Sequence, residues 1–417
     1  MAIVDLLEES KEQKGFYTPQ FEIRITDPRK PNTAAPTQIP NDVLRDIVEA
    51  TYKDNCKEID SFELTVNNWD PTTNSFKYVG AETPETLNED TPEGRRHRFF
   101  EPCNKEVEVK MGYVGELRVM LTGNFTTMEP NFPTSGAPTL TVRGLNILHQ
   151  LRRKQYVYAW ENKRDSEIAK NLATLRDRDT GQKRFPLPIE IDDNAVGKEP
   201  PIDYVAEQNQ YDIDFLLARA RERGYTIFIQ EADPKVRGSK RRLYFGPSQE
   251  GRIPGLRDVT FKLEWGKSLI DFKPTLTTAN QVRSVTVNGW NRRTGRPIQE
   301  KASLDDREFT RNRDLFELLQ KCDPREEIVV EEPFFSPRQA KDRAKAILLE
   351  RQKEMVKCSA TTVGLPDLRA GKLVRIEGLG SRFSGTYFIT DTTHTIGNNG
   401  YTTKFNARRE DQEGQQQ

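Results

Sequence analysis

A ten-residue motif occurs twice in this chain, 221 positions apart. LTVNNWDPTT at residues 64–73 is matched by VTVNGWNRRT at residues 285–294, with Thr, Val, Asn, Trp and Thr in register. Two weaker matches follow in the same chain order. The first has two parts, which pair residues 109–112 with 374–378 and residues 123–125 with 385–387, and the second pairs residues 136–143 with 400–405. The common order favours two related modules, at about residues 15–150 and 255–408. The alternative is that unrelated antiparallel barrels share glycine turns and Val/Thr strands, because β propensity selects the same residues. The tryptophan motif argues against it.

Most of the chain alternates apolar and polar residues in short runs bounded by Gly, Pro, Asn and Asp, which predicts strands. Clear examples are Phe62-Leu64-Val66, Val107-Val109-Met111, Leu117-Val119-Leu121, Val259-Phe261-Leu263 and Tyr401-Thr403-Phe405. We therefore predict a mainly β fold with minor α content: two related antiparallel β-barrel modules that flank a helix-containing middle region.

A few helices are predicted from their caps and their apolar spacing. One begins at Asp212 and ends before Gly224, and another begins after Ser336, with Pro337 at its first position. Shorter helices are predicted near residues 165–173 and 315–319. Stretches at 26–40, 81–94 and 187–201 are rich in Pro and polar residues, which predicts loops, and residues 410–417 are predicted to be a disordered tail.

The charge balance excludes wholesale electrostatic capture of nucleic acid or anionic membrane. Lys plus Arg and Asp plus Glu number 64 each, and hydrophobic residues make up only 35% of the chain, a lean core that suits modules burying further surface on assembly. No apolar run approaches the roughly 20 residues that span a bilayer. The first residues lack the pattern of a secretory signal, so we expect synthesis in a cytosol.

No catalytic, cofactor-binding or metal-binding residue is predicted. The four cysteines form no CxxC pair, which favours free buried thiols. The histidines lack metal-ligand spacing, and His394 is expected to be a buried, hydrogen-bonded structural imidazole. Glycines near residue 380 lack the Lys-Ser/Thr of a phosphate loop and no helix is predicted to begin there, so a hairpin turn is expected. The acidic pairs at 192–193 and 331–332 are expected on a solvated surface. The residues considered are Cys56, Cys103, Cys322, Cys358, His97, His149, His394, Gly378, Gly380 and Gly385.

Basic side chains gather at residues 235–242 and 292–296, where hairpin tips carry solvated charge and no aromatic residues interleave for base stacking. Contact with a partner or with a channel remains an alternative for both loops. Arg219, Arg221 and Arg223 lie on one predicted helix, either as an exposed face or as a salt-bridged subunit contact.

Four segments together resemble the late-control-protein-D and VgrG-like hub proteins of contractile phage tails, type VI secretion and extracellular injection systems. They are KEVEVKMGYVGELRVMLTGNF with PTLTVRGLNILHQLRR, AEQNQYDIDFLLARARERGY, WGKSLIDFKPTLTTANQVRSVTVNGWN, and FSGTYFITDTTHTIGNNGYTTKFNARR. The resemblance covers nearly the whole chain. The chain departs from full-length VgrG proteins by ending at Gln417, without room for a spike domain, so the spike is expected to be another polypeptide.

The resemblance implies a structural role. In that family, two barrels per subunit of a homotrimer form a pseudo-six-fold ring that joins a hexameric inner tube to a trimeric spike. By that resemblance, residues 1–150 form the first hub barrel with an N-terminal extension, 151–254 a middle α+β region, 255–408 the second barrel with inserted helices, and 409–417 a tail. The implied partners are further copies of the chain, the inner tube protein, the spike protein, and a tape-measure protein or cargo. The expected location is the baseplate of a particle assembled in a bacterial cytoplasm.

Two other functions compete with this one. A β-rich, wall-degrading hydrolase needs convergent carboxylates or a nucleophile with a histidine, which the sequence does not assemble. A receptor- or glycan-binding tail protein needs exposed aromatic platforms, whereas Trp69 and Trp290 occupy equivalent motif positions, which suggests packing. We therefore interpret the chain as a binding protein that is not an enzyme.

Overall fold

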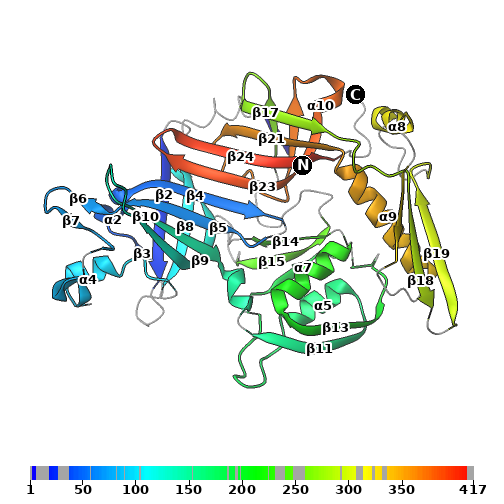
Figure 1. Cartoon of the computed structure of the whole chain (residues 1–417), viewed down its shortest axis with the longest axis horizontal. Helices are drawn as coiled ribbons and strands as arrows, with labels where there is room; N and C mark the ends of the chain where they lie inside the picture. The colour runs from blue at the N-terminus through cyan, green and yellow to red at the C-terminus, as the bar shows by residue number, and fades with distance from the viewer. Residues whose placement is uncertain are drawn as a thin grey trace.

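The computed structural model describes residues 2–5, 18–26, 37–56, 58–80, 82–88, 90–102, 105–152, 154–185, 187–192, 196–197, 199–223, 225–230, 240–247, 259–291, 294–306, 313–321, 325–330 and 336–410. The fold is mainly β, as predicted, and its largest sheet joins strands from both halves of the chain (Figure 1).

We call the N-terminal set of strands the first strand group. Its members are β2 (Pro19–Thr26), β4 (Ile47–Asn55), β5 (Ser61–Asn67), β8 (Glu106–Tyr113), β9 (Glu116–Asn131) and β10 (Thr139–Asn146), with the short β3 (Thr37–Gln38) and helix α2 (Asn41–Asp46). They lie in the order β4-β5-β10-β9-β8-β2, all antiparallel. Alternate side chains of these strands form one core, with Tyr52, Leu64 and Val142 fully buried.

The second strand group comes from the C-terminal part of the chain. Its members are β16 (Val259–Glu264), β17 (Leu269–Leu276), β21 (Val356–Val363), β22 (Leu373–Glu377), β23 (Gly385–Gly397) and β24 (Gly400–Arg409), with β1 (Ala2–Asp5) at its edge and α10 (Gly380–Phe383) before β23. Their order is β17-β21-β24-β23-β22-β16, around a second core. The pairs β1–β16 and β16–β22 are parallel, since the chain reaches β16 and β22 by long crossovers.

The two strand groups have the same strand order, although the first strand runs antiparallel to its neighbour in one group (β2 beside β8) and parallel in the other (β16 beside β22). Numbered by chain order, the six strands of each group lie in the spatial sequence second, third, sixth, fifth, fourth, first. Each group also has two β-bulges at corresponding places. In the first group the extra, unpaired residues are Val48 in β4 and Thr126 in β9; in the second group they are Ile270 in β17 and Thr390 in β23. Shared order and shared irregularities support a duplicated unit, because bulges are positional features of a fold.

This topology corrects the strongest of the sequence matches. Residues 64–73 begin in β5, whose counterpart is β21, whereas residues 285–294 lie mainly in β18 (Ser284–Asn291), a strand outside both groups. The weaker matches do pair equivalent strands: β8 with β22, β9 with β23, and β10 with β24. The tryptophan motif is therefore the coincidence of strand and turn residues that the sequence alternative described.

Each group carries one insertion, at different places. In the first group, β5 and β8 are separated by β6 (Trp69–Asp70), β7 (Ser75–Phe76), α3 (Pro84–Leu87) and α4 (Pro92–His97); the helices correct the loop predicted at 81–94. Both helices have a threonine N-cap followed by proline. In the second group, β17 and β21 are separated by β18, β19 (Arg296–Ser303), α8 (Arg313–Gln320), β20 (Glu326–Val329) and α9 (Pro337–Lys353).

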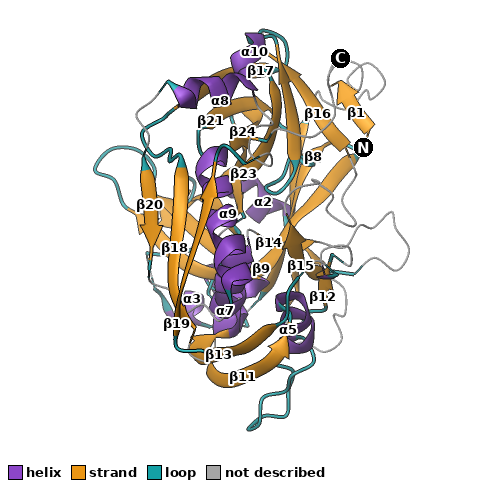
Figure 2. Cartoon of the chain, turned by 90° about the vertical axis from the view of Figure 1, so that its right-hand side faces the viewer, coloured by secondary structure: helices purple, strands orange, loops and turns teal. Residues whose placement is uncertain are grey.

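Helix α9 covers one face of the insertion sheet, which is β19-β18-β20 (Figure 2). Ser336 caps it by accepting a hydrogen bond from Gln339 N, as predicted, and Ala340, Ala344, Ile347 and Leu348 form its buried face.

A middle unit joins the groups and has its own core. Its elements are η1 (Ile147–Arg152), β11 (Gln155–Lys163), α5 (Asp165–Leu172), β12 (Ile189–Ile191), β13 (Ile202–Tyr211), α7 (Asp212–Arg223), β14 (Tyr225–Gln230) and β15 (Arg242–Pro247). The predicted helices at 165–173 and from Asp212 are present, and β12 replaces part of the loop predicted at 187–201. The domain boundaries stay a prediction.

Candidate functional site: the junction of the two strand groups

Strands β4 and β23 join the two strand groups into one sheet. The first part of β23 pairs with β22 of its own group, but its second part pairs with β4, from Asp391 opposite Asn55 to Ile396 opposite Ala50. This antiparallel ladder fixes how one group sits against the other. The side chains around it are the candidate site, because they hold the two strand groups in one arrangement.

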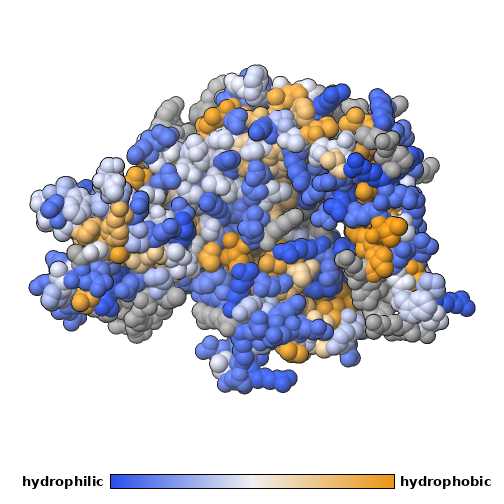
Figure 3. Space-filling model, viewed as in Figure 1, coloured by the Kyte–Doolittle hydropathy of each residue, from blue (hydrophilic) through white to orange (hydrophobic). Residues whose placement is uncertain are grey.

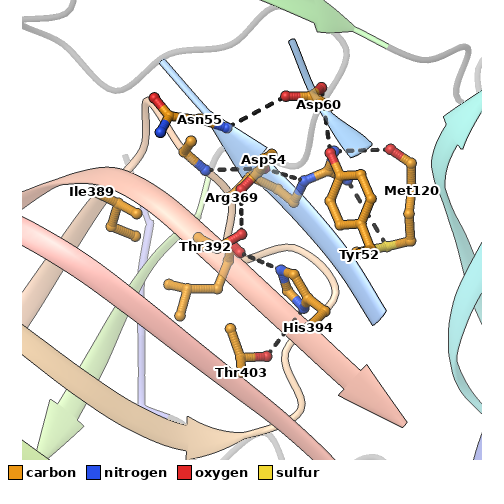
Figure 4. Close-up of polar contacts among 12 residues, drawn as sticks. Tyr52, Asp54, Asn55, Asp60, Met120, Arg369, Ile389, Thr392, His394 and Thr403 are labelled. Atoms are coloured by element: carbon orange, nitrogen blue, oxygen red, sulfur yellow. Dashed lines mark hydrogen bonds and ion pairs between the residues drawn. The ribbon is translucent and has the colours of Figure 1, made fainter. Parts of the chain in front are cut away.

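Arg369, in the loop before β22, is the centre of a buried polar network (Figure 4). Its Nε donates to Asp54 Oδ2 at 2.7 Å, and its Nη2 donates to the Met120 carbonyl at 2.9 Å and to the Tyr52 hydroxyl. The Asp54 carboxylate also accepts from the Ala370 amide and the Thr392 hydroxyl. Arg369 thus joins β4 and β9 of the first group to a loop of the second.

His394 holds the same loop from β23. Its Nε2 lies 3.1 Å from the Leu368 carbonyl, which only accepts, so Nε2 carries the proton. Its Nδ1 lies 3.0 Å from the Tyr401 hydroxyl and 3.1 Å from Thr403 Oγ1. Complete burial lowers the pKa of His394 to about 4, so the imidazole is neutral. The predicted buried, hydrogen-bonded His394 is confirmed.

Tyr113 of β8 adds a further link, because its hydroxyl donates to the Gly364 carbonyl at 3.0 Å at the start of the same loop. The junction therefore holds residues 364–370 from both groups. Within the described ranges, no group of three or more His, Cys, Asp or Glu side chains is arranged to hold a metal ion. The arrangement holds the two strand groups in a fixed orientation. Each of its charged groups is paired within the chain, so none is left for chemistry on a ligand.

The middle unit contains two more buried ionic clusters. Asp165 accepts from Arg219 Nε at 2.6 Å and from Arg223, so two of the three arginines predicted as an exposed face or a subunit contact instead bind within the chain. Arg184 joins Glu207 and Asp212. Burial, together with the neighbouring Asp212 carboxylate, raises the pKa of Glu207 to about 7.

The other residues considered from the sequence do not converge. His97 ends α4 and His149 lies in η1, whereas His394 lies in β23. Gly378 lies two residues before α10, a helix of one turn that begins at Gly380, where a hairpin turn was expected. Asp192 follows β12, and Arg242 pairs with Glu190. Cys56 and Cys358 are buried free thiols, as predicted, and burial raises the pKa of both.

Some predictions fall on residues outside the described ranges. These are Cys103, Cys322, Asp193, residues 331–332, 235–239, 292–293 and 411–417. Glu410, predicted in the tail, is instead buried and pairs with Lys353 at 2.6 Å, which corrects the start of that tail.

The expected packing of the motif tryptophans holds for one of them. Trp69 packs edge-on against Phe76, with 5.3 Å between ring centroids. Trp290 is 55% exposed, so its predicted packing is wrong within this chain. It lies on the face of the insertion sheet opposite α9, together with the exposed Ile328 and Val330. Figure 3 shows hydrophobic atoms gathered at the end of the molecule where α9 and β18 lie.

Sequence reasoning missed Arg369 and Asp54. One signal was available: Asp54 follows Ala50 and Tyr52 at the inward positions of a strand, where a charged residue predicts a buried partner. The identity of that partner, 315 residues away, depends on the pairing of β4 with β23.

Residues 95–398 match the model of a sequence family described as the Alg8 N-terminal domain. That span is more than half of the chain. The chain belongs to the Alg8 N-terminal domain family. The matched span of this Alg8-family chain runs from α4 to the end of β23, and it includes the middle unit and the loop with Arg369. The family description names a domain and no activity. No curated protein sequence matches the chain.

The fold of this Alg8-family chain is similar to that of solved tail proteins. A 43 kDa tail protein of prophage MuSo2 from Shewanella oneidensis has a TM-score of 0.60 and 14% identity, covering 94% of this chain and 98% of that one. A tail protein from Neisseria meningitidis has a TM-score of 0.59 and 12% identity, with 94% and 97% covered. The Escherichia coli c3393 protein, described as a component of the type VI secretion system, has a TM-score of 0.50 and 12% identity, with 88% and 74% covered. At these identities the likeness describes the fold.

Proposed function

We propose that this chain is a structural hub in the baseplate of a contractile phage tail or injection particle, where it acts by binding and not by turnover. The likeness to tail proteins and to a type VI secretion component supports a place in such a particle. No helix in the described part of the chain is long and apolar enough to cross a bilayer.

One observation carries the specific role: two strand groups of identical strand order lie in one chain and share one sheet. Three copies of such a chain present six similar units around a three-fold axis. A ring of this kind matches a six-fold partner on one side and a three-fold partner on the other. The hub thereby adapts a hexameric inner tube to a trimeric spike and starts assembly of the tube.

The junction network supplies the rigidity that this role requires. A symmetry adaptor works only if its two units keep a fixed relation, and Arg369, Asp54 and His394 fix that relation from inside the sheet. The proposed partners are two further copies of the chain, the inner tube protein, the spike protein and a tape-measure protein or cargo. The particle assembles in a bacterial cytoplasm.

Light scattering of the purified protein, alone and with the neighbouring spike candidate, tests this function. We expect three times the chain mass of 48.0 kDa in one or both samples, and a ring with six similar lobes by electron microscopy. A monomer in both samples contradicts the hub role.

A further inference from the structure

Eight strands of the large sheet form a continuous strip with two open ends. The strip runs β17-β21-β24-β23-β4-β5-β10-β9, so it begins in the second strand group and ends in the first. Among the described strands, none pairs with the outer edge of β17, or with residues 127–131 of β9 on the side away from β10. Open strand edges invite pairing with another strand.

Aligning the two groups by their shared strand order identifies the counterpart of the strand at each open end of the strip. One row of paired residues in the first group is Ala50, Leu64, Val142, Met128, and the equivalent row in the second is Phe272, Ala360, Phe405, Thr392. The same alignment makes the bulge residues equivalent: Val48 corresponds to Ile270, and Thr126 corresponds to Thr390. Thus β4 corresponds to β17, and the second part of β23 corresponds to residues 127–131 of β9.

Within the chain, β4 and β23 already pair. Their counterparts, β17 and the end of β9, are the two open ends of the strip. Transferring the register of the junction places Thr275 opposite Glu129, Leu276 opposite Met128, and Phe272 opposite Phe132, the residue that directly follows β9.

The side chains at these positions suit a contact between copies. The inward-facing positions of the intrachain junction hold the polar network of Tyr52, Asp54, Thr392 and His394. The equivalent positions of the open ends are apolar throughout: Phe272, Pro274, Leu276, Met128, Pro130 and Phe132. Phe132 is 52% exposed and the other five are half-buried. Phe272, Leu276 and Met128 pack partly against the cores of their own groups, and Phe132 packs against Phe76, but all six side chains remain partly exposed along an unpaired strand edge.

We propose that β17 of one copy lies against the end of β9 of a second copy, in the register that β4 and β23 use within the chain. This inference rests on the proposed trimeric function and names the surface that closes the ring. The interface is heterologous, so three copies form a closed ring if the rotation closes.

The outward face of the same edges adds a selective contact. In the transferred register, Lys273 lies diagonally across from Glu129, within reach of a long side chain. Pro130 and Pro274 fall opposite each other and cannot donate backbone hydrogen bonds, so side chains dominate the contact at that point. The prolines also protect both edges against unspecific strand addition before assembly.

A cysteine pair tests the register. In the variant Glu129→Cys with Thr275→Cys, both positions are exposed and directly opposite across the proposed interface, where residues are close enough for a disulfide. Under mild oxidation we expect covalent trimers on a non-reducing gel. A mixture of the two single variants should give covalent dimers only, which shows that the bond joins different chains.

The matched control is Glu129→Cys with Asp271→Cys, which is shifted by four residues and should remain uncrosslinked. The wild-type chain under the same oxidant controls for its own cysteines. Efficient crosslinking of the shifted pair, or none of the Glu129–Thr275 pair, overturns the proposed register.

A second variant separates this inference from the proposed function. Phe132→Asp should lower the mass in solution to that of a monomer, because it places a charge in the apolar contact, whereas Val157→Asp, at an exposed apolar residue of β11, should not. A wild-type trimer that survives Phe132→Asp contradicts this interface and leaves the hub role standing. A wild-type monomer with and without the spike candidate contradicts both.

Discussion

Arg369 determines the strength of the contact between the strand groups, since one guanidinium serves a carboxylate, a hydroxyl and a carbonyl from β4 and β9. The ion pair is buried, with both side chains less than 10% exposed. Removing one partner of such a pair leaves an uncompensated charge in the interior, which costs more than the pair itself contributes.

We therefore expect Arg369→Met to destabilise the chain by about 3–5 kcal/mol in urea denaturation. The control is Arg143→Met, which removes an exposed guanidinium that binds Glu63 and Glu129 on the surface of the first group and should have a much smaller effect. Equal effects of the two substitutions would contradict the role given to the junction.

His394 makes the junction sensitive to acid. Its folded-state pKa of about 4 lies below the ordinary value of 6.5, so the unfolded chain binds a proton that the folded chain rejects. The contribution of this group to stability is therefore complete above pH 6.5 and falls as the pH drops from 6.5 to 4, by about 3 kcal/mol. The raised pKa of Glu207 acts in the opposite direction over an overlapping pH range, because its contribution falls as the pH rises toward 7.

Thermal melts from pH 4 to pH 8 measure this dependence. The variant His394→Gln should lose the acid destabilisation that His394 causes, so its stability relative to the wild type should rise as the pH falls from 6.5 to 4, while His149→Gln, outside the junction, should keep the wild-type profile. An unchanged profile in His394→Gln would show that the acid dependence has another source.

At the scale of elements, helix α9 holds the insertion sheet, and its start depends on one hydroxyl. Ser336→Ala removes the bond to Gln339 N and should cost about 1 kcal/mol of stability. Ser336→Asp keeps an oxygen acceptor at the N-cap and should retain most of the stability. Chemical denaturation followed by circular dichroism distinguishes the two; equal losses would mean that the cap bond contributes nothing.

Elements with a local signal were predictable and the others were not. Caps and apolar spacing gave α7 and α9, and alternation gave most strands, because these patterns depend on neighbours within a few residues. The motif at residues 64–73 failed as a guide to equivalence, because strand composition is shared by β5 and β18 although their partners differ. The pairs β4–β23 and Asp54–Arg369 depend on contacts between distant segments, which no local pattern specifies.

At the scale of the whole molecule, separate cores predict separate unfolding. Trp160 is 5% exposed in the core of the middle unit, whereas Trp265 and Trp290, in the second group and its insertion, are exposed. Trp69 is half-buried against Phe76 in the insertion of the first group. In a Trp69→Phe background, tryptophan fluorescence should therefore follow the middle unit, and far-ultraviolet circular dichroism should follow the strand groups.

We expect the two signals to give different urea midpoints, and Trp160→Phe to remove most of the fluorescence change. Coincident midpoints, with Arg369→Met moving both signals equally, would show instead that the units unfold as one cooperative body.

The β4–β23 ladder and the proposed β17–β9 contact use equivalent strands, but only the first joins segments of one polypeptide. Two segments of one chain meet at an effective concentration that is independent of how much protein is present. The junction inside the chain therefore forms at any dilution, whereas its counterpart between chains obeys mass action. Closure of the proposed ring should therefore depend on the concentration of the chain, and each copy enters it with the junction inside the chain already formed.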